Sequence, residues 1–216
     1  LDIAGCAREA VDEAIAAMDP APVAPGKYDI ILRNDAMASI LGAFAGMFSA
    51  DAAQKGLSPL AGREGEDMAA ECVTLMDDPL YPINPSPFDD EGTPSVAKAV
   101  IKDGKLETLL HNLKTAKKAG VKSTSNGGRS SAGSPVGVRI TNFYIAPKEG
   151  TLGQLISELG DGLLITDFSG LHAGVNPVSG KFSVLCKGRL IKDGRDVRAV
   201  NEITLSGDFT ELLRSI

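Results

Sequence analysis

The tetrapeptide Ile-Lys-Asp-Gly occurs twice in this chain of 216 residues, at 101–104 and at 191–194. Each copy stands between two runs that are rich in apolar residues. Asp-Gly between such runs is a strong β-hairpin signal, because both central residues of a type I′ turn need positive φ angles. The sequence therefore predicts repeated antiparallel hairpins rather than a parallel sheet.

The other segments add helices to these hairpins. Helical spacing of apolar residues predicts an amphipathic helix over 1–18 and a second helix after Asn34, whose apolar face carries Met37, Ile40, Leu41, Phe44 and Phe48. Shorter helices are predicted at 112–119, 151–159 and 208–216, and further strands at 28–32, 71–76, 106–111, 138–145, 163–168 and 181–191. We expect an α+β fold with helices packed on a large, curled, mostly antiparallel sheet. Residues 1–216 are expected to form a single domain.

Charge and composition argue against several classes of protein. The net charge of −6 leaves no general basic face for phosphates, so no nucleic-acid partner is expected. The three cysteines form no Cys-x-x-Cys pair and are predicted to be thiols in a reducing compartment. The longest small apolar run is shorter than the ~20 residues of a membrane span, and no signal peptide is visible. We expect a soluble, cytoplasmic protein without a membrane partner, and we interpret the chain as a piece of a longer one because it opens inside a helical pattern.

A run of three carboxylates, Asp89, Asp90 and Glu91, ends the most proline-dense segment of the chain. Adjacent acids repel one another, so such a run needs compensation from water, backbone N–H donors, cations or raised pKa values. The run could bind Mg²⁺ or Ca²⁺, or supply an acid/base pair. It could equally be a turn whose carboxylates accept backbone hydrogen bonds, and the absence of a nearby His or Cys favours the turn.

Other chemical motifs are weak. Neither His111 nor His172 has a His, Glu or Cys partner three or four residues further on, so a transition-metal site made by this chain alone is not expected. Ser95 and Lys98 match Ser-x-x-Lys, but they precede a strand rather than open a helix, and Ser169 near His172 lacks an assignable acid. The segment 114–129 has five basic residues and no acid, and it could bind an anion or a peptide carboxylate or be a solvated, mobile stretch. The Gly/Ser-rich loop over 120–137, which overlaps it, looks too polar to pack.

Seven motifs in order resemble the TldD/PmbA family: PFDDEGTP, VIKDGKLETLLHNLKTAKKAG, TSNGGRS, RITNFYIAP, TLGQLI, GLHAGVNPVSGKFS and ITLSGDF. This resemblance covers the chain from about residue 25 onward. The family is also known as modulators of DNA gyrase and is understood as a metalloprotease system that pairs two related subunits. It implies that the chain is the family's C-terminal domain and that the N-terminal domain lies outside it.

The resemblance also implies which subunit this is. The TldD-like subunit carries His-Glu-x-x-x-His on a helix and binds zinc, whereas the PmbA-like (TldE) subunit lacks these ligands. Here Gly42 to Met47 stands in place of that motif, so neither the metal nor its general base is expected in this chain. By this resemblance the chain is a PmbA-like member without a catalytic residue or cofactor of its own, and zinc is expected only in a TldD-like partner. RITNFYI, by contrast, is closer to the TldD branch.

The implied function is to complete a chamber that binds unfolded peptides for proteolysis or peptide maturation. The expected partners are a TldD-like subunit or a second copy, forming a dimer, and peptides held by strand addition. For peptide contacts the sequence suggests His172, Asn176 and Ser179 within 170–183, and Asn126 and Arg129 in a mobile rim over 123–134. Asp89, Asp90 and Glu91 would pin the sheet or face the partner. Two alternatives remain: a standalone hydrolase using that acidic cluster, or a non-proteolytic module that binds gyrase.

Overall fold

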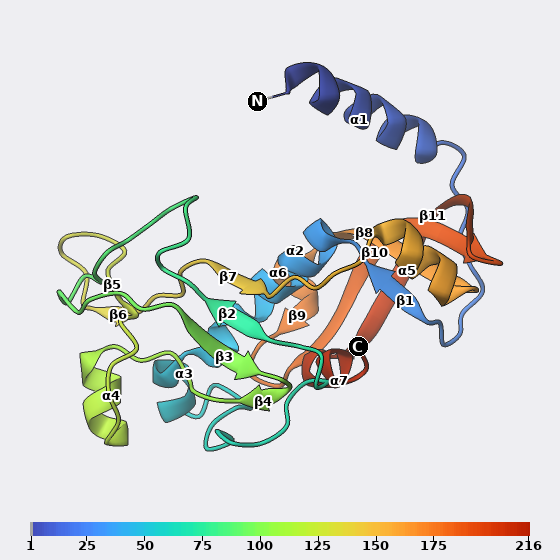
Figure 1. The fold of residues 1–216 in the computed structure, drawn as a ribbon. Coiled ribbons are helices and arrows are strands. Elements are labelled where there is room, and N and C mark those ends of the chain that lie inside the picture. Colours follow the sequence, from blue (N-terminus) through green and yellow to red (C-terminus); the bar gives the residue numbers. More distant parts are fainter. Residues whose placement is uncertain (1) are drawn as a thin grey trace. The chain divides into compact units, whose positions relative to one another are not determined.

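The computed structural model describes residues 2–216, which fall into two compact units interleaved along the chain (Figure 1). The first unit comprises Leu1–Ile40, Lys148–Gly174 and Ser183–Ser206. The second comprises Leu41–Pro147, Val175–Phe182 and Gly207–Ile216. The expectation of a single domain stays a prediction.

The first unit is built on a sheet with the strand order β1-β8-β10-β11. Its strands are β1 (Ile30–Leu32), β8 (Gly162–Ser169), β10 (Lys181–Lys192) and β11 (Arg195–Asp208), the last two extending beyond the unit at one end. Its helices are α1 (Ile3–Ala16), α5 (Leu152–Leu159) and α6 (Leu171–Gly174), with most of α2 (Asn34–Phe44). β8 runs antiparallel to β10, but β1 pairs with β8 in parallel. The antiparallel prediction therefore holds for the hairpins and not for β1.

The second unit is built on an antiparallel sheet with the order β4-β3-β2-β7. The strands are β2 (Leu75–Asp77), β3 (Lys98–Lys102), β4 (Lys105–Leu106) and β7 (Phe143–Ile145), and a separate pair is formed by β5 (Gly127–Gly128) and β6 (Gly137–Val138). β9 (Val175–Asn176) pairs with the start of β10. The helices are a 3-10 turn (Ala45–Phe48), α3 (Ala50–Gln54), α4 (Leu113–Ala119) and α7 (Phe209–Arg214). The α+β class is confirmed, with its strands divided among separate sheets.

Both Asp-Gly turns have the predicted backbone. The φ angles are 47° and 82° at Asp103 and Gly104, and 49° and 68° at Asp193 and Gly194. Each turn joins two consecutive strands, β3 to β4 and β10 to β11. The short sequence signal was sufficient because a type I′ turn is specified by its own two residues.

Two of the predicted helices begin with a capping box. The side chains of Asn112 and Thr151 each accept a hydrogen bond from the N–H three residues on, and the side chains of Thr115 and Gln154 return the contact. These reciprocal bonds satisfy N–H groups that a helix start otherwise leaves unpaired. The helices predicted at 112–119 and 151–159 are thereby confirmed.

The core of the second unit is aromatic. Phe44 stacks on Phe209 with a centroid distance of 4.5 Å and meets Phe182 edge-on at 6.1 Å. Phe48 packs against Phe143 at 5.2 Å. Among the described residues no helix is long and apolar enough to cross a membrane. The predicted apolar face of the second helix is confirmed as core at Ile40, Leu41, Phe44 and Phe48, which are buried, whereas Met37 is only half-buried.

Candidate functional site

The segment Gly42 to Met47, which by the resemblance stands in place of His-Glu-x-x-x-His, covers the end of α2 and most of the 3-10 turn that follows. Phe44 and Met47 are fully buried in the core. Gly42 and Gly46 lie on the opposite side, where an added Cβ would meet no atom within 4 Å. The segment therefore packs into the core through Phe44 and Met47, and it exposes backbone without a side chain at Gly42 and Gly46.

These residues do not fit a zinc ion. Zinc in proteins is bound by imidazole, thiolate or carboxylate groups, and the side chains of Gly42, Ala43 and Met47 supply none of them. Across residues 2–216 the structure brings no three His, Cys, Asp or Glu side chains together in an arrangement that could hold a metal. No reaction step is therefore assigned to a metal at this segment.

The acidic turn is bonded to backbone donors. The Oδ1 atom of Asp89 accepts the N–H groups of Glu91 and Thr93 at 3.0 and 2.8 Å, and its Oδ2 accepts the Gly127 N–H at 2.8 Å. The Asp89 side chain is buried, so these three donors replace the water that a carboxylate otherwise needs. The interpretation of this run as a hydrogen-bonded turn agrees with these contacts.

The other two acids extend the same pattern to segments far along the chain. Asp90 accepts the Arg129 N–H at 2.7 Å, and Glu91 accepts the Leu113 N–H at 2.7 Å, where α4 begins. The run thus fixes the middle of the 123–134 loop, at Gly127 and Arg129, and the start of α4. Charge-assisted bonds of this kind are about twice as strong as neutral ones.

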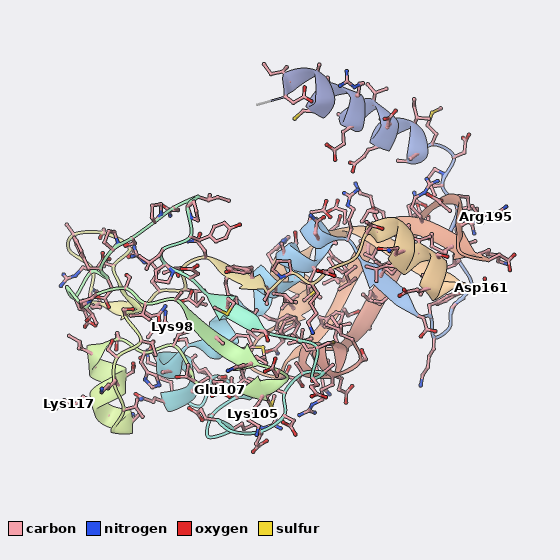
Figure 2. The ribbon with its side chains drawn as sticks, viewed as in Figure 1. Lys98, Lys105, Glu107, Lys117, Asp161 and Arg195 are labelled. Atoms are coloured by element: carbon pink, nitrogen blue, oxygen red, sulfur yellow. The ribbon has the colours of Figure 1, made fainter. Side chains whose placement is uncertain are left out.

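A buried carboxylate that the sequence reasoning missed lies next to this loop. Asp77 is fully buried at the end of β2 and forms an ion pair with the Lys98 Nζ atom at 2.9 Å; Figure 2 shows Lys98 on β3. The same carboxylate accepts the Asn126 side-chain amide at 2.8 Å, and the Thr141 N–H and hydroxyl, both at 2.8 Å. The sequence predicts a strand over 71–76, immediately before Asp77, and no local signal points to the partners of this carboxylate.

Asn126 was suggested as a peptide contact, and its side chain is instead used inside the unit. Its exposure is 1%, and its amide donates to Asp77 and to the Arg139 carbonyl while its oxygen accepts from the Thr124 hydroxyl. No polar atom of this side chain is left for a peptide. The prediction that the whole 120–137 loop is too polar to pack is wrong for residues 125–128, which are buried because polar partners meet them there.

The remaining suggested contacts are exposed and lie in separate parts of the fold. Arg129 is exposed in the second unit, and there Asn176 caps a tight turn by accepting the N–H groups of Val178 and Ser179 at 3.0 and 3.2 Å. His172 is exposed on α6 in the first unit. Peptide binding by these residues stays a prediction.

Ser95 and Lys98, the two residues of the Ser-x-x-Lys match, bond to different parts of the chain and not to each other. Lys98 forms an ion pair with Asp77 and is the first residue of β3. Ser95 precedes the strand and its N–H donates to the Pro87 carbonyl. This agrees with treating the match as chance, since Ser and Lys do not share a helix turn.

His111 is a buried histidine whose Nδ1 atom has no hydrogen-bond partner among the described residues. Its carbonyl accepts from the backbone N–H groups of Thr124 and Asn126. Burial lowers the pKa of the imidazole below its ordinary 6.5, and the charge of Glu64 only partly offsets this. His111 is therefore held neutral in the folded chain.

The lowered pKa of His111 predicts that the stability of the fold depends on pH. The unfolded chain binds a proton below about pH 6.5 while the folded chain resists it, so the free energy of unfolding falls as pH drops below 6.5. Urea unfolding between pH 7.5 and about 5 should show a smaller slope with pH in His111→Gln than in the wild type. An unchanged slope in His111→Gln would contradict this assignment.

Known proteins match the chain over most of its length. Residues 25–216 match the family model described as the PmbA/TldA metallopeptidase C-terminal domain. A metalloprotease from Archaeoglobus fulgidus is 35% identical over 81% of this chain and 40% of its own length, and metalloprotease PmbA from Escherichia coli O157:H7 is 26% identical over 99% of this chain and 44% of its own. The chain spans less than half the length of these relatives.

Solved structures give the same result. A Thermotoga maritima protein named as a modulator of a DNA gyrase superimposes with a TM-score of 0.90 at 40% identity, covering 96% of this chain and 47% of that one. TldE from Thermococcus kodakarensis also has a TM-score of 0.90, at 29% identity over 99% of this chain and 49% of its own. The chain belongs to the PmbA/TldD metallopeptidase family, and residues 25–216 correspond to the C-terminal domain of that family.

Proposed function

We propose that this chain is part of a PmbA/TldE-like subunit of a TldD/TldE-type metalloprotease system. It would help form the chamber that binds unfolded peptides and leave the zinc chemistry to a TldD-like partner. The observation that carries this proposal is the segment 42–47, where Gly42, Ala43 and Met47 stand at the positions for which the zinc-binding branch has two imidazoles and a glutamate. The similarity to a TldE structure over 99% of the chain supports the same branch.

The proposed division of labour has a physical basis. A zinc ion held by three protein ligands beside a general base would activate water for peptide hydrolysis, and in this proposal the TldD-like partner would supply those groups. This chain would supply surface that holds an extended peptide in place, which raises the rate by positioning alone. The exposed residues Arg129, His172, Asn176 and Ser179 are the candidates for polar contacts.

The test is reconstitution with a companion chain that contains His-Glu-x-x-x-His. Reduced, carboxymethylated lactalbumin is used as an unfolded substrate and native lactalbumin as its folded control. We expect cleavage of the unfolded protein only when both chains are present. Equal cleavage by the companion alone would contradict the proposal.

A second candidate is a non-proteolytic module that binds gyrase, and the name of the Thermotoga maritima relative is the observation that favours it. The two functions differ in what the chain retains from a cell extract. Recovery of gyrase subunits without any TldD-like chain would support the second candidate. Recovery of a TldD-like chain without gyrase would support the first.

A further inference from the structure

Positive charge is concentrated in one stretch of this acidic chain. Residues 108–147 contain six of the chain's 22 basic residues and none of its 28 acidic ones. The chain as a whole has a net charge of −6, so this stretch has the opposite sign to the rest. Such a separation of charge indicates a local surface that the net charge conceals. The six basic residues are Lys114, Lys117, Lys118, Lys122, Arg129 and Arg139.

The fold keeps these six residues at one end of the second unit. Three of the lysines, including Lys117, lie on α4, and the arginines directly follow β5 and β6 (Figures 1 and 2). At the start of α4, the Asn112 side-chain amide donates to the Gly137 carbonyl at 3.2 Å. The Asn126 N–H donates to the His111 carbonyl. These bonds join α4 to the β5–β6 hairpin, and we call the surface formed by the six basic residues the basic end.

Most of these cations have no counter-charge in the chain. All six residues are exposed. Among the described residues, Arg139 alone of the six has a carboxylate oxygen within 4.0 Å, that of Asp90 at 3.9 Å. The acids of the neighbouring turn at 89–91 accept backbone N–H groups, and Asp51 on the adjacent α3 pairs with Lys55. The basic end therefore presents unpaired positive charge to its surroundings.

The stability of α4 does not account for all of these lysines. Lys117 and Lys118 lie in its last turn, where a positive charge is favourable. Lys114 lies in the first turn, where the helix dipole opposes a positive charge, and Lys122 lies beyond the end of the helix. Because like charges repel one another, an external anion would stabilise the set.

We propose that the basic end binds a flexible acidic segment of a partner protein. This inference goes beyond the proposed function and does not require a companion chain. Hydrogen bonds between carboxylates and ammonium or guanidinium groups are stronger than neutral ones, and a flexible segment can place its carboxylates where these groups lie. The attraction extends over a Debye length of about 8 Å at physiological salt, so it also guides the approach of the segment.

Other kinds of anionic partner fit this surface less well. Residues 112–139 contain no aromatic residue, so the bases of a single-stranded nucleic acid have no side chain on which to stack. A DNA duplex or a membrane is an extended anion, and it would bring its negative charge close to the acidic remainder of the chain. A short acidic segment contacts the basic end alone, because charges further away than about 8 Å are largely screened.

The test measures the fluorescence anisotropy of a short labelled peptide that alternates Glu and Ser. The same peptide with Gln in place of Glu is the uncharged control and should not bind. A variant in which the four lysines of the basic end become glutamine should bind the acidic peptide at least about tenfold more weakly than the wild type. Raising the salt concentration about tenfold should weaken wild-type binding by a similar factor, because the charges are exposed. The variant combines Lys114→Gln, Lys117→Gln, Lys118→Gln and Lys122→Gln.

A matched control loses the same net charge from other parts of the surface. It changes four exposed lysines outside the basic end, and its affinity for the acidic peptide should stay within about twofold of the wild type. Arginine at the four positions of the basic end should also preserve binding, which separates loss of charge from damage to the fold. The control combines Lys27→Gln, Lys102→Gln, Lys148→Gln and Lys192→Gln.

Four results would overturn the inference. The first is no binding of the acidic peptide by the wild type at about 50 mM salt, where exposed charges attract strongly. The second is equal weakening in the two glutamine variants, since net charge would then decide binding. The third is tighter binding, at the same salt, of a DNA duplex of about 20 base pairs or of phosphatidylglycerol vesicles. The fourth is a dimer in sedimentation that the basic-end variant dissociates while no peptide binds, because a second copy would then occupy the surface.

Discussion

Asp77→Asn is expected to lower the free energy of unfolding by about 3 kcal/mol. The aspartate receives donors from Lys98, Asn126 and Thr141 while fully buried, and asparagine offers one acceptor where the carboxylate offers two. Its amide hydrogens would face donors, and the half-buried Lys98 would lose its counter-charge. Urea unfolding followed by circular dichroism measures the change.

Asp51→Asn is the matched control, because Asp51 pairs with Lys55 at the surface of α3. Pairs of this kind contribute about 0.5 kcal/mol or less, so this variant should unfold at nearly the wild-type urea concentration. The Asp77 variant should also exchange the buried amide protons of residues 125–128 faster, since Asn126 loses its partner. A loss below about 1 kcal/mol in Asp77→Asn would show that the network does not hold the loop.

Gly188→Ala is expected to cost about 3 kcal/mol and to lower the melting temperature by about 10 °C. Gly188 lies in β10 at a shift of register against β8, and an added Cβ would lie 2.0 Å from the Leu164 carbonyl oxygen. The obstacle is backbone, so no side chain can rotate away. The two strands must separate or the bulge must move.

The control is Gly153→Ala in α5, in the same unit. The nearest atom to its Cβ is the Thr151 hydroxyl at 4.0 Å, which is ordinary contact, and alanine favours a helix by about 1 kcal/mol. This variant should be as stable as the wild type or more so. If Gly188→Ala unfolds at the wild-type temperature, the close approach of β10 to β8 is not as described.

Features specified by neighbouring residues could be predicted from the sequence. The two Asp-Gly turns and the caps at Asn112 and Thr151 depend on side chains within three positions of each other. The apolar face of α2 follows from helical spacing in the same way. Features of this kind can be recognised from a short stretch of sequence, because the residues that determine them are neighbours in the chain.

Features specified by distant residues could not be predicted. Asp77, Lys98, Asn126 and Thr141 come from four separate segments, and none of them is unusual where it stands. Dependence on distant residues also explains why the strand predicted over 106–111 is reduced to the short β4. It likewise explains why β1 pairs in parallel with β8, which lies more than a hundred positions later in the chain. Pairing over such distances is decided by tertiary packing.

The candidate site also contains both features set by neighbouring residues and features set by distant ones. The acidic turn at 89–91 could be recognised as a hydrogen-bonded turn from its composition, but its bonds to Gly127, Arg129 and Leu113 are long-range. Asn126 was chosen because a Gly/Ser-rich loop looked mobile, and its burial depends on a carboxylate from β2.

The most direct test of the central claim uses the purified chain by itself. Its zinc content and its hydrolysis of carboxymethylated lactalbumin are measured before and after treatment with a chelator, with the reconstituted pair as the active reference. The account predicts no stoichiometric zinc and no hydrolysis from this chain alone, because residues 42–47 offer the metal no ligand. Hydrolysis by the chain alone that the chelator stops would contradict it.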